Sequence, residues 1–254
     1  TQAPRKRSIH EKNLIGQGPG LQRSEVMEFY ADIADVRQIK ALQAWLPLDG
    51  VTTNPTIVAK EKKELFRLIE ELLAACTGTV HVQTLGYSAD EIVADAKRLA
   101  AVEPARIIPK IPVTQAGLAA VRQLSAEGIR TTVTGIVTVA QGLIAAKAGA
   151  TYVAPYVNWV DNIERSGTEV VAELLTALEE YDFASKVLAA SVKSARQFRE
   201  LVAFGTHAVT MPPETYALVL EHPLTDQALQ RFEESWRSAF AEYRLDSKLR
   251  GQNS

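Results

Sequence analysis

This 254-residue sequence has little cysteine. It also lacks long hydrophobic runs and a marked excess of charge of either sign. Its single cysteine, Cys76, cannot form an internal disulfide, and its four histidines do not stand at the spacings of metal ligands. No run of about 18 apolar residues occurs, so we expect no membrane-spanning helix. With 28 Lys and Arg residues against 30 Asp and Glu residues, the net charge is -2, which gives no electrostatic footprint for nucleic acid or an anionic membrane. These absences argue against metal, membrane and nucleic-acid functions, and the lack of a targeting signal favours the cytoplasm.

The two ends of the chain differ from its centre. Residues 1–26 are polar and basic, and three glycines and a proline within residues 16–20 would interrupt any helix there. We interpret this segment as a disordered leader or an artificial extension, because Met27 stands directly before the first apolar strand; a basic arm that binds a partner is the alternative. Residues 27–222 then form the main domain, and residues 223–254 form a C-terminal helix and tail.

From Met27 onward, short β-branched runs alternate with stretches of helical hydrophobic spacing. The predicted strands are Glu28–Ile33, Gly50–Thr53, Thr79–Thr84, Ala105–Ile111, Arg130–Thr134, Thr151–Pro155, Lys186–Ser191 and His207–Thr210. The predicted helices between them are Val36–Trp45, Lys62–Ala75, Ser88–Ala100, Thr114–Ala126, Val139–Ala148, Gly167–Tyr181, Ser194–Ala203 and Pro213–Leu220. Such alternation implies parallel strands with right-handed crossovers, and eight units in roughly 200 residues predict an α/β fold, a single (β/α)8 TIM barrel. An open doubly wound sheet fits less well, because it needs a glycine-rich first turn and none of residues 33–36 is glycine.

A further helix, Thr225–Tyr243, follows the eighth unit and carries apolar residues at helical spacing. These residues are Leu229, Phe232, Trp236 and Phe240. A helix beyond a complete barrel must bury such a face, either on its own barrel or on a neighbouring subunit. We favour the neighbouring subunit, and therefore a homo-oligomer.

One lysine stands where a strand usually carries an aliphatic side chain. Lys110 lies between Pro109 and Ile111, and Pro112 marks the end of this strand because proline lacks a ladder donor. Burial of the lysine stem would disfavour the charged ammonium and lower the pKa of Lys110, and a neutral amine can attack a carbonyl. The alternative is an ordinary strand-end lysine whose head reaches water.

Several other strands end in a hydrogen-bonding residue, and in this fold the reactive groups come from the C-terminal strand ends. Besides Lys110, these residues are Asp32, Thr53, Asn54, Gln83, Thr134, Tyr156 and Ser191. Each could be only a helix cap, a turn residue or a solvated strand end. Around one lysine they form the set that a Schiff-base enzyme needs: an amine nucleophile, a carboxylate and an amide to hold donor hydroxyls, and a hydroxyl to move protons.

Six motifs stand in collinear order between residues 27 and 240. They are Met27–Asp32 (MEFYAD), Gly50–Thr56 (GVTTNPT), Lys110–Thr114 (KIPVT), Ala140–Gly142 (AQG), Tyr152–Asn158 (YVAPYVN) and Val187–Ser191 (VLAAS). Together they resemble the small transaldolase and fructose-6-phosphate aldolase family. The resemblance implies a class I aldol mechanism on a (β/α)8 barrel, with Lys110 as the Schiff-base lysine.

The resemblance also implies roles for individual positions. Asp32 and Asn54 orient the donor, while Gln83, Thr134 and Tyr156 handle the catalytic water and proton transfer. True transaldolases of this family typically have glutamate and phenylalanine at the positions of Gln83 and Tyr156. A phenol can donate and recover a proton during carbon-carbon cleavage, whereas a phenyl ring cannot. We therefore expect the aldolase branch.

The implied reaction makes or cleaves the C3–C4 bond of a ketose such as fructose 6-phosphate, with dihydroxyacetone and an aldehyde as the other partners. The lysine-bound iminium is the electron sink, so no metal or organic cofactor is expected. The alternatives are a transaldolase that moves the dihydroxyacetone unit between sugar phosphates and a non-catalytic barrel that binds sugar phosphates. The resemblance further implies a ring-built homo-oligomer, such as a decamer, with no nucleic-acid or membrane partner.

Trp159 departs from the family pattern. After Val157–Asn158 the family usually has an arginine that resembles a phosphate clamp, and an indole cannot bind phosphate bidentately. Ser191, Lys193 and Arg165 remain as candidate phosphate contacts. We therefore expect a weakened preference for phosphorylated acceptor aldehydes, in favour of unphosphorylated or more apolar ones.

Overall fold

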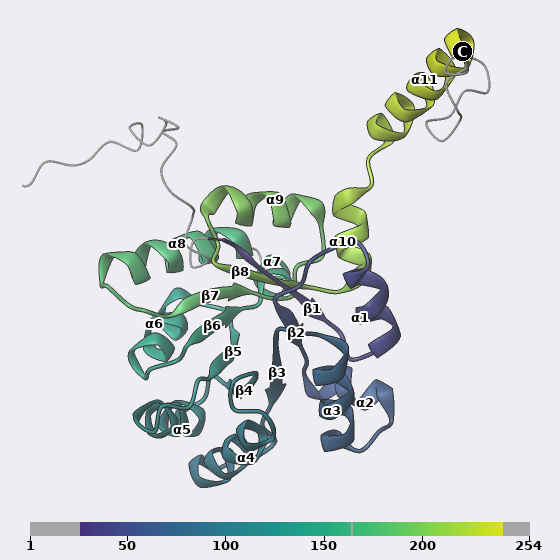
Figure 1. Ribbon diagram of the computed structural model, residues 1–254. Coiled ribbons are helices and arrows are strands. Elements are labelled where there is room, and N and C mark those ends of the chain that lie inside the picture. Colours follow the sequence, from purple (N-terminus) through teal and green to yellow (C-terminus); the bar gives the residue numbers. More distant parts are fainter. Residues whose placement is uncertain (1–25, 164, 241–254) are drawn as a thin grey trace, which may run out of the picture.

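The chain folds into a closed barrel of eight parallel strands, in which each strand pairs with the next in chain order and the last pairs with the first (Figure 1). The computed structural model describes residues 26–163 and 165–240. The strands are β1 (Glu28–Asp32), β2 (Gly50–Thr52), β3 (Thr79–Gln83), β4 (Ile107–Pro112), β5 (Thr132–Ile136), β6 (Tyr152–Pro155), β7 (Lys186–Ala189) and β8 (Ala208–Met211). This confirms the predicted (β/α)8 barrel, because a closed ring of strands is incompatible with the open doubly wound sheet.

Helices follow the strands along the chain, and all but the last of them, α11, surround the barrel (Figure 1). They are α1 (Val36–Gln43), α2 (Pro55–Glu61), α3 (Leu65–Ala75), α4 (Ala89–Val102), α5 (Gln115–Ala126), α6 (Val139–Lys147), α7 (Val157–Asp161), α8 (Gly167–Glu180), α9 (Ala195–Phe204), α10 (Pro213–Leu220) and α11 (Pro223–Phe240). Ser88 and Ser194 each form a capping box at a helix start, and the Thr114 side chain accepts a hydrogen bond from the Gly117 N–H. Gly205 ends α9 in the left-handed conformation, with φ of 75°.

Side chains fill the interior of the barrel on the N-terminal side of the strand ends that carry the predicted site. Its buried apolar cluster consists of Tyr30, Ile108, Tyr152, Ala154, Leu188 and Ala208. At the N-terminal end of the strands, the Glu28 carboxylate accepts hydrogen bonds from the Tyr30 and Tyr152 hydroxyls, both at 2.9 Å, and from the Lys186 ammonium. This packing and hydrogen bonding occupy the lower part of the interior and leave space at the C-terminal end, where this fold places its binding sites.

Two helices that the sequence pattern did not predict, α2 and α7, come directly after β2 and β6. Asn54 caps α2 by accepting a hydrogen bond from the Ile57 N–H at 2.9 Å, and Pro55 occupies the first helical position. The prediction that a helix starts at Lys62 is wrong, because Lys62 ends α2 in the left-handed conformation with φ of 51°. The next helix, α3, begins only at Leu65.

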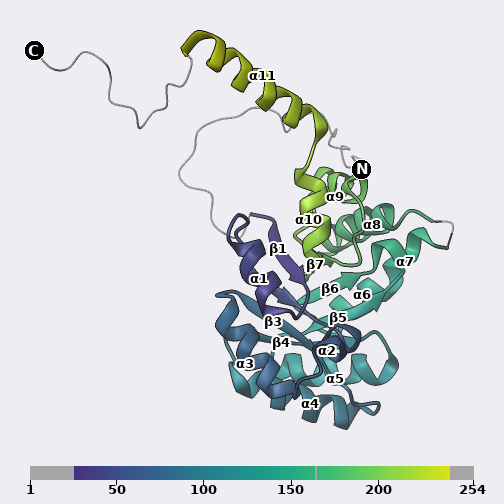
Figure 2. The ribbon, with the colours of Figure 1, turned by 90° about the vertical axis from the view of Figure 1, so that its right-hand side faces the viewer.

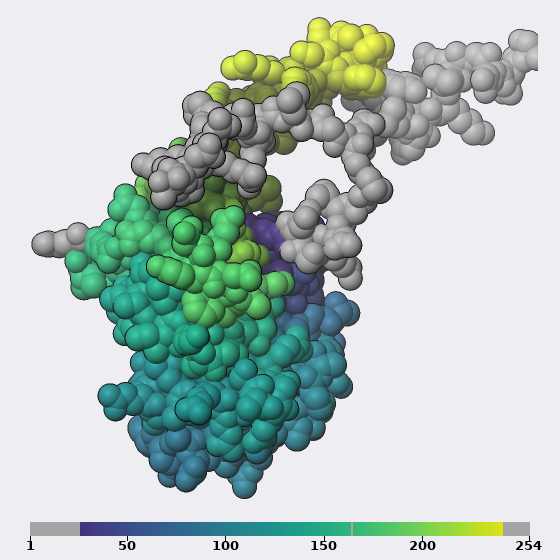
Figure 3. Space-filling view, turned by 90° about the vertical axis from the view of Figure 1, so that its left-hand side faces the viewer, coloured from purple at the N-terminus to yellow at the C-terminus, as the bar shows by residue number. Residues whose placement is uncertain are grey.

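The last helix, α11, leaves the body of the molecule (Figures 1 and 2). None of its residues is buried, and its exposed apolar side chains include Leu229, Phe232 and Phe240. In the space-filling view, the yellow atoms of α11 project beyond the barrel (Figure 3). The alternative in which this helix covers its own barrel is therefore wrong, whereas its packing on a neighbouring subunit stays a prediction.

The remaining predictions about the chain ends fall mostly outside the part that the structure describes. The leader predicted for residues 1–26 overlaps the described residues only at Val26, and the tail beyond Phe240 lies outside them. Within residues 26–163 and 165–240, no helix is long and apolar enough to cross a membrane.

Candidate active site

Lys110 lies on β4, near the C-terminal end of the barrel. It is only 3% exposed, and its Nζ donates a hydrogen bond to the backbone oxygen of Thr53 at 2.7 Å. Burial lowers the pKa of Lys110, and this effect outweighs the nearby Asp32 carboxylate, which favours the charged ammonium. The alternative of a strand-end lysine whose head reaches bulk water is therefore wrong.

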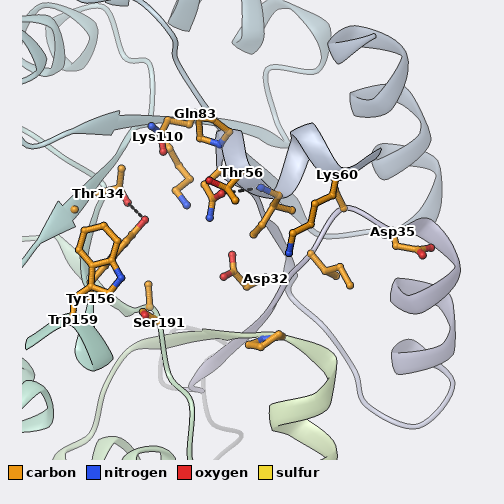
Figure 4. A pocket seen from close by; sticks show the side chains of 18 of the residues that line it. Asp32, Asp35, Thr56, Lys60, Gln83, Lys110, Thr134, Tyr156, Trp159 and Ser191 are labelled. Carbon is orange, nitrogen blue, oxygen red and sulfur yellow. Dashed lines mark hydrogen bonds between the residues drawn. The ribbon is translucent and has the colours of Figure 1, made fainter. Parts of the chain in front are cut away.

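A cavity of about 1000 Å³ opens at this end of the barrel. The predicted residues that line it are Asp32, Asn54, Gln83, Lys110, Thr134, Tyr156, Trp159, Ser191 and Lys193. In Figure 4, the Lys110 amine and the Asp32 carboxylate point toward each other across the cavity, with Tyr156 and Ser191 beside them. Strand ends that are far apart in the sequence thus place an amine, a carboxylate and a phenol around one space.

Asp32 is held in place by the Thr52 hydroxyl, which a second threonine hydroxyl supports. The Thr52 Oγ1 donates a hydrogen bond to Asp32 Oδ1 at 2.8 Å, and it lies 2.6 Å from the Thr210 Oγ1. Because the Thr52 hydroxyl has a single proton, Thr210 must be the donor in the second bond. Both threonines are buried, so the carboxylate is fixed from below and can accept hydrogen bonds from a bound polyol above.

Tyr156 follows β6 directly and stands next to Thr134 of β5. The Thr134 hydroxyl donates a hydrogen bond to the Tyr156 Oη at 3.1 Å. Burial raises the pKa of Tyr156; the hydrogen bond from Thr134 acts against this and the Asp32 carboxylate adds to it. The phenol therefore keeps its proton at neutral pH and can give it to a group in the cavity.

Two amides complete this part of the site. The Asn54 Oδ1 is occupied as the cap of α2, so its amide nitrogen is the group left for a ligand. Gln83 stands at the end of β3, opposite Lys110 in the register of β3 and β4. Its side chain makes no hydrogen bond to any residue within the described part of the chain, so both its donor and its acceptor are available for water or a ligand.

Comparison with known proteins agrees with this geometry. The model of a family described as Transaldolase/Fructose-6-phosphate aldolase matches residues 29–249. The chain belongs to this transaldolase/aldolase family. A "Probable transaldolase" of Streptococcus agalactiae is 39% identical over 212 residues, which cover 84% of this chain and 98% of that protein. A "Probable transaldolase" of Kosmotoga olearia is 38% identical over 223 residues, which cover 88% of this chain and 100% of that protein.

Solved structures of low sequence identity share the barrel. A mutant flavocytochrome b2 with pyruvate bound has a TM-score of 0.52 at 12% identity, covering 85% of this chain and 64% of that one. A mandelate oxidase mutant has a TM-score of 0.51 at 15% identity, covering 85% of this chain and 77% of that one. At such low identity these likenesses show the fold alone. The enzymatic transaldolase/aldolase family, by contrast, is shown by sequence over most of the chain.

In this transaldolase/aldolase family member, one side of the cavity carries an indole. Trp159 on α7 is 56% exposed and packs against the Tyr156 ring, with ring centroids 4.8 Å apart and planes at 81°. Ser191, just beyond β7, adopts a left-handed conformation with φ of 58°, and Lys193 follows it. The structure therefore brings the predicted Trp159, Ser191 and Lys193 to the same cavity as Lys110.

Two predicted substrate-binding residues of this transaldolase/aldolase chain do not reach the cavity. Thr53 is fully buried, and its hydroxyl donates a hydrogen bond to the His81 backbone oxygen at 3.0 Å. Only the Thr53 carbonyl, which accepts from Lys110, contributes to the site. Arg165 forms an ion pair with Glu173 at 2.7 Å and does not line the cavity, so its position does not support a role as a relocated phosphate clamp.

Sequence reasoning missed Thr52, Thr56 and Lys60. Thr56 and Lys60 line the cavity from α2, and Figure 4 shows the Lys60 side chain on the side opposite Trp159. The signal that could have found them is the Asn54–Pro55 pair, a preferred N-cap followed by a preferred first helical residue. Among residues 26–163 and 165–240, no three His, Cys, Asp or Glu side chains are grouped as metal ligands would be.

Proposed function

We propose that this chain is a class I aldolase that forms a Schiff base through Lys110 and releases dihydroxyacetone from a ketose such as fructose 6-phosphate. The observation that carries the proposal is the Lys110 amine, which is buried and has a lowered pKa in a cavity shared with Asp32 and Tyr156. A neutral amine adds to a carbonyl, whereas an ammonium cannot.

In the cleavage direction, the Lys110 Nζ attacks C2 of the ketose, and the carbinolamine loses water to give an iminium. The C4 hydroxyl then loses its proton as the C3–C4 bond breaks, the bonding electrons pass into the iminium to give an enamine, and the aldehyde leaves. Protonation of the enamine at C3 and hydrolysis of the iminium release dihydroxyacetone and restore the amine. Each step balances with water and protons alone.

The surrounding side chains supply binding and proton transfer. Asp32 and the Asn54 amide hold hydroxyls of the dihydroxyacetone unit, since both residues line the cavity that contains Lys110. Tyr156 exchanges a proton with the reacting oxygen, and Gln83 with Thr134 positions the water that hydrolyses the iminium. The synthetic direction uses the same groups in reverse.

The competing function is transaldolase activity, which the names of the curated relatives favour. The two reactions differ in the fate of the enamine: an aldolase protonates and hydrolyses it, while a transaldolase holds it until an acceptor aldehyde arrives. The phenol of Tyr156 favours the aldolase, because it can donate the proton that ends the cycle.

The test is the release of free dihydroxyacetone from fructose 6-phosphate with no acceptor aldehyde added. We expect steady release by the wild type and a loss of about 100-fold or more in Tyr156→Phe, as for removal of a general acid. Dihydroxyacetone transfer that occurs only when erythrose 4-phosphate is added, with no free product, would establish the transaldolase instead.

For the aldehyde, we propose a weakened preference for phosphate. Trp159 presents an exposed indole to the cavity, and Arg165 is paired with Glu173. Lys193, close to Ser191, is therefore the cation left to bind a phosphate on the side of the cavity that carries Trp159. We expect fructose and fructose 6-phosphate to be cleaved with similar kcat/KM, and Trp159→Arg to favour the phosphorylated ketose. A strong phosphate preference that Arg165→Ala abolishes would contradict this arrangement.

A further inference from the structure

Tyr156 is anchored through its backbone, and two further contacts hold its ring. Its N–H donates to the Ile136 oxygen at 2.8 Å, and the next N–H, of Val157, donates to the Ala190 oxygen at 2.9 Å. Tyr156 is the N-cap residue of α7, yet its side chain makes no capping hydrogen bond. The phenol is therefore free to rotate unless something beyond the backbone holds it.

Two contacts hold the ring, one on each side. On the barrel side, the Thr134 hydroxyl donates to the Tyr156 oxygen at 3.1 Å. On the solvent side, the indole of Trp159 meets the ring in an edge-to-face arrangement, at 4.8 Å and 81°. Figure 4 shows Trp159 beside Tyr156 at the edge of the cavity, away from Asp32 and Lys60.

The backbone of α7 fixes where Trp159 can go. Trp159 stands in the first turn of α7, three residues after the N-cap Tyr156, and its indole contacts the Tyr156 ring. The Asn158 N–H donates to the Ser191 oxygen at 3.2 Å, which ties the first turn of α7 to the chain after β7. With 56% of the Trp159 side chain still exposed, burial alone does not account for this position, and the contact with Tyr156 is its principal ring contact.

We propose that Trp159 is a positioning residue, which presses the Tyr156 ring against Thr134 and keeps water off its outer face so that the phenol exchanges its proton with the bound substrate. This inference rests on the proposed aldolase reaction, in which Tyr156 transfers the proton. It assigns Trp159 a role in the chemical step, in addition to its effect on which aldehyde binds.

The inference predicts a pH signature. The charged groups that line the same cavity as Tyr156 are Asp32 of β1, Asp35 before α1, Lys60 and Glu61 of α2, Lys110 of β4, Lys193 after β7 and Glu214 of α10. Burial is the main cause of the raised pKa of Tyr156. Removing the indole lets water reach the ring and returns the pKa toward its ordinary value, so activity that needs the protonated phenol is lost at a lower pH.

The experiment measures kcat, KM and the pH profile of ketose cleavage in the full chain with Trp159→Ala, Trp159→Phe, Tyr156→Phe and the double variant Trp159→Ala/Tyr156→Phe. We expect Trp159→Ala to lower kcat about ten- to 100-fold and to move the alkaline limb to lower pH, and Trp159→Phe to restore most of both. In the double variant, losing the indole should cost almost nothing further, because it acts through the hydroxyl that is already absent. Ile163→Ala, an exposed apolar residue just past α7 that does not line the cavity, is the control and should match the wild type.

Three results would overturn the inference: an unchanged kcat and pH profile in Trp159→Ala, a rise in KM alone, or full additivity of the two substitutions in the double variant. A rise in KM alone would mean that the indole only forms a wall for the substrate. Wild-type protein that cleaves no ketose would instead refute the proposed function itself, and the two failures are therefore distinguishable.

Discussion

At the scale of single residues, the reactivity of Lys110 depends on a balance between two opposing effects. Burial favours the neutral amine, and the Asp32 carboxylate favours the ammonium. Burial has the larger effect, so the acid limb of kcat/KM should fall below the pH at which an ordinary lysine titrates. In the proposed reaction Asp32 binds the donor, and its charge makes Lys110 more basic than burial alone would leave it.

Replacing this carboxylate tests the balance. Asp32→Asn removes the negative charge that favours the ammonium form of Lys110, so the pKa of Lys110 falls further. The acid limb of kcat/KM should therefore move to lower pH. The plateau rate should drop, because the donor is oriented less well. Asp35→Asn is the control: Asp35 lines the rim and caps α1, and asparagine caps equally well, so its pH profile should equal that of the wild type. An acid limb that moves to higher pH in Asp32→Asn would contradict the assignment.

Most of the site could be predicted residue by residue, because parallel strands in a barrel bring their C-terminal ends to one face. Thr53 is the exception, because a position at a strand end does not by itself decide which face a side chain points to. Successive side chains of a strand point to opposite faces, so if Thr52 points inward to Asp32, Thr53 must point outward. The partners of Arg165 could not be predicted, since an exposed ion pair depends on where α8 places Glu173.

At the scale of elements, the short helices α2 and α7 were the hardest to predict and carry much of the site. With seven and five residues they are too short for a clear hydrophobic period. The long elements were predicted well, because alternating strand and helix patterns repeat over the whole barrel. Lys60 and Trp159 both depend on these short helices for their place in the cavity.

Asn54 caps α2 and, in the proposed reaction, binds the donor through its amide. Two substitutions separate these roles. Asn54→Ala removes both the cap of α2 and the amide, so it should lower the free energy of unfolding by about 1 kcal/mol and reduce activity. Asn54→Asp keeps a capping oxygen but loses the amide donor, so stability should stay near that of the wild type while activity falls. Denaturant unfolding and steady-state kinetics on the same samples measure the two effects; normal activity in Asn54→Asp would exclude the amide from donor binding.

At the scale of the whole molecule, we expect the C-terminal end of the barrel to determine activity and the N-terminal end to contribute to stability. The C-terminal end carries the cavity, and the N-terminal end is held by the Glu28 carboxylate with its bonds to Tyr30, Tyr152 and Lys186. Glu28→Ala removes the acceptor of both tyrosine hydroxyls, only one of which can then donate to the other across 3.4 Å, so it should cost about 2 kcal/mol of unfolding free energy with kcat unchanged. Glu173→Ala, which breaks only an exposed ion pair, should cost less than about 1 kcal/mol. A large fall in kcat for Glu28→Ala would mean that the two ends are coupled.

The assembly is a further proposal at this scale: we propose that α11 packs on a neighbouring copy of this chain in a ring-built homo-oligomer. In proteins most of the stability of a helix comes from packing of its apolar face, and α11 buries none of its residues on its own barrel. Leu229→Glu with Phe232→Glu should therefore lower the molar mass measured by sedimentation, while Gln230→Glu on the same helix should not. An unchanged mass in the double variant would remove α11 from the interface. Location in the cytoplasm stays a prediction.

The most direct test of the central claim is reductive trapping of the Schiff base. The protein is incubated with dihydroxyacetone and borohydride, and its intact mass and peptide map are measured. We predict one reduced dihydroxyacetone unit per chain, attached to Lys110 and absent in Lys110→Met. An unchanged mass, or an adduct on Lys60 in the same cavity with Lys110 unmodified, would contradict the account.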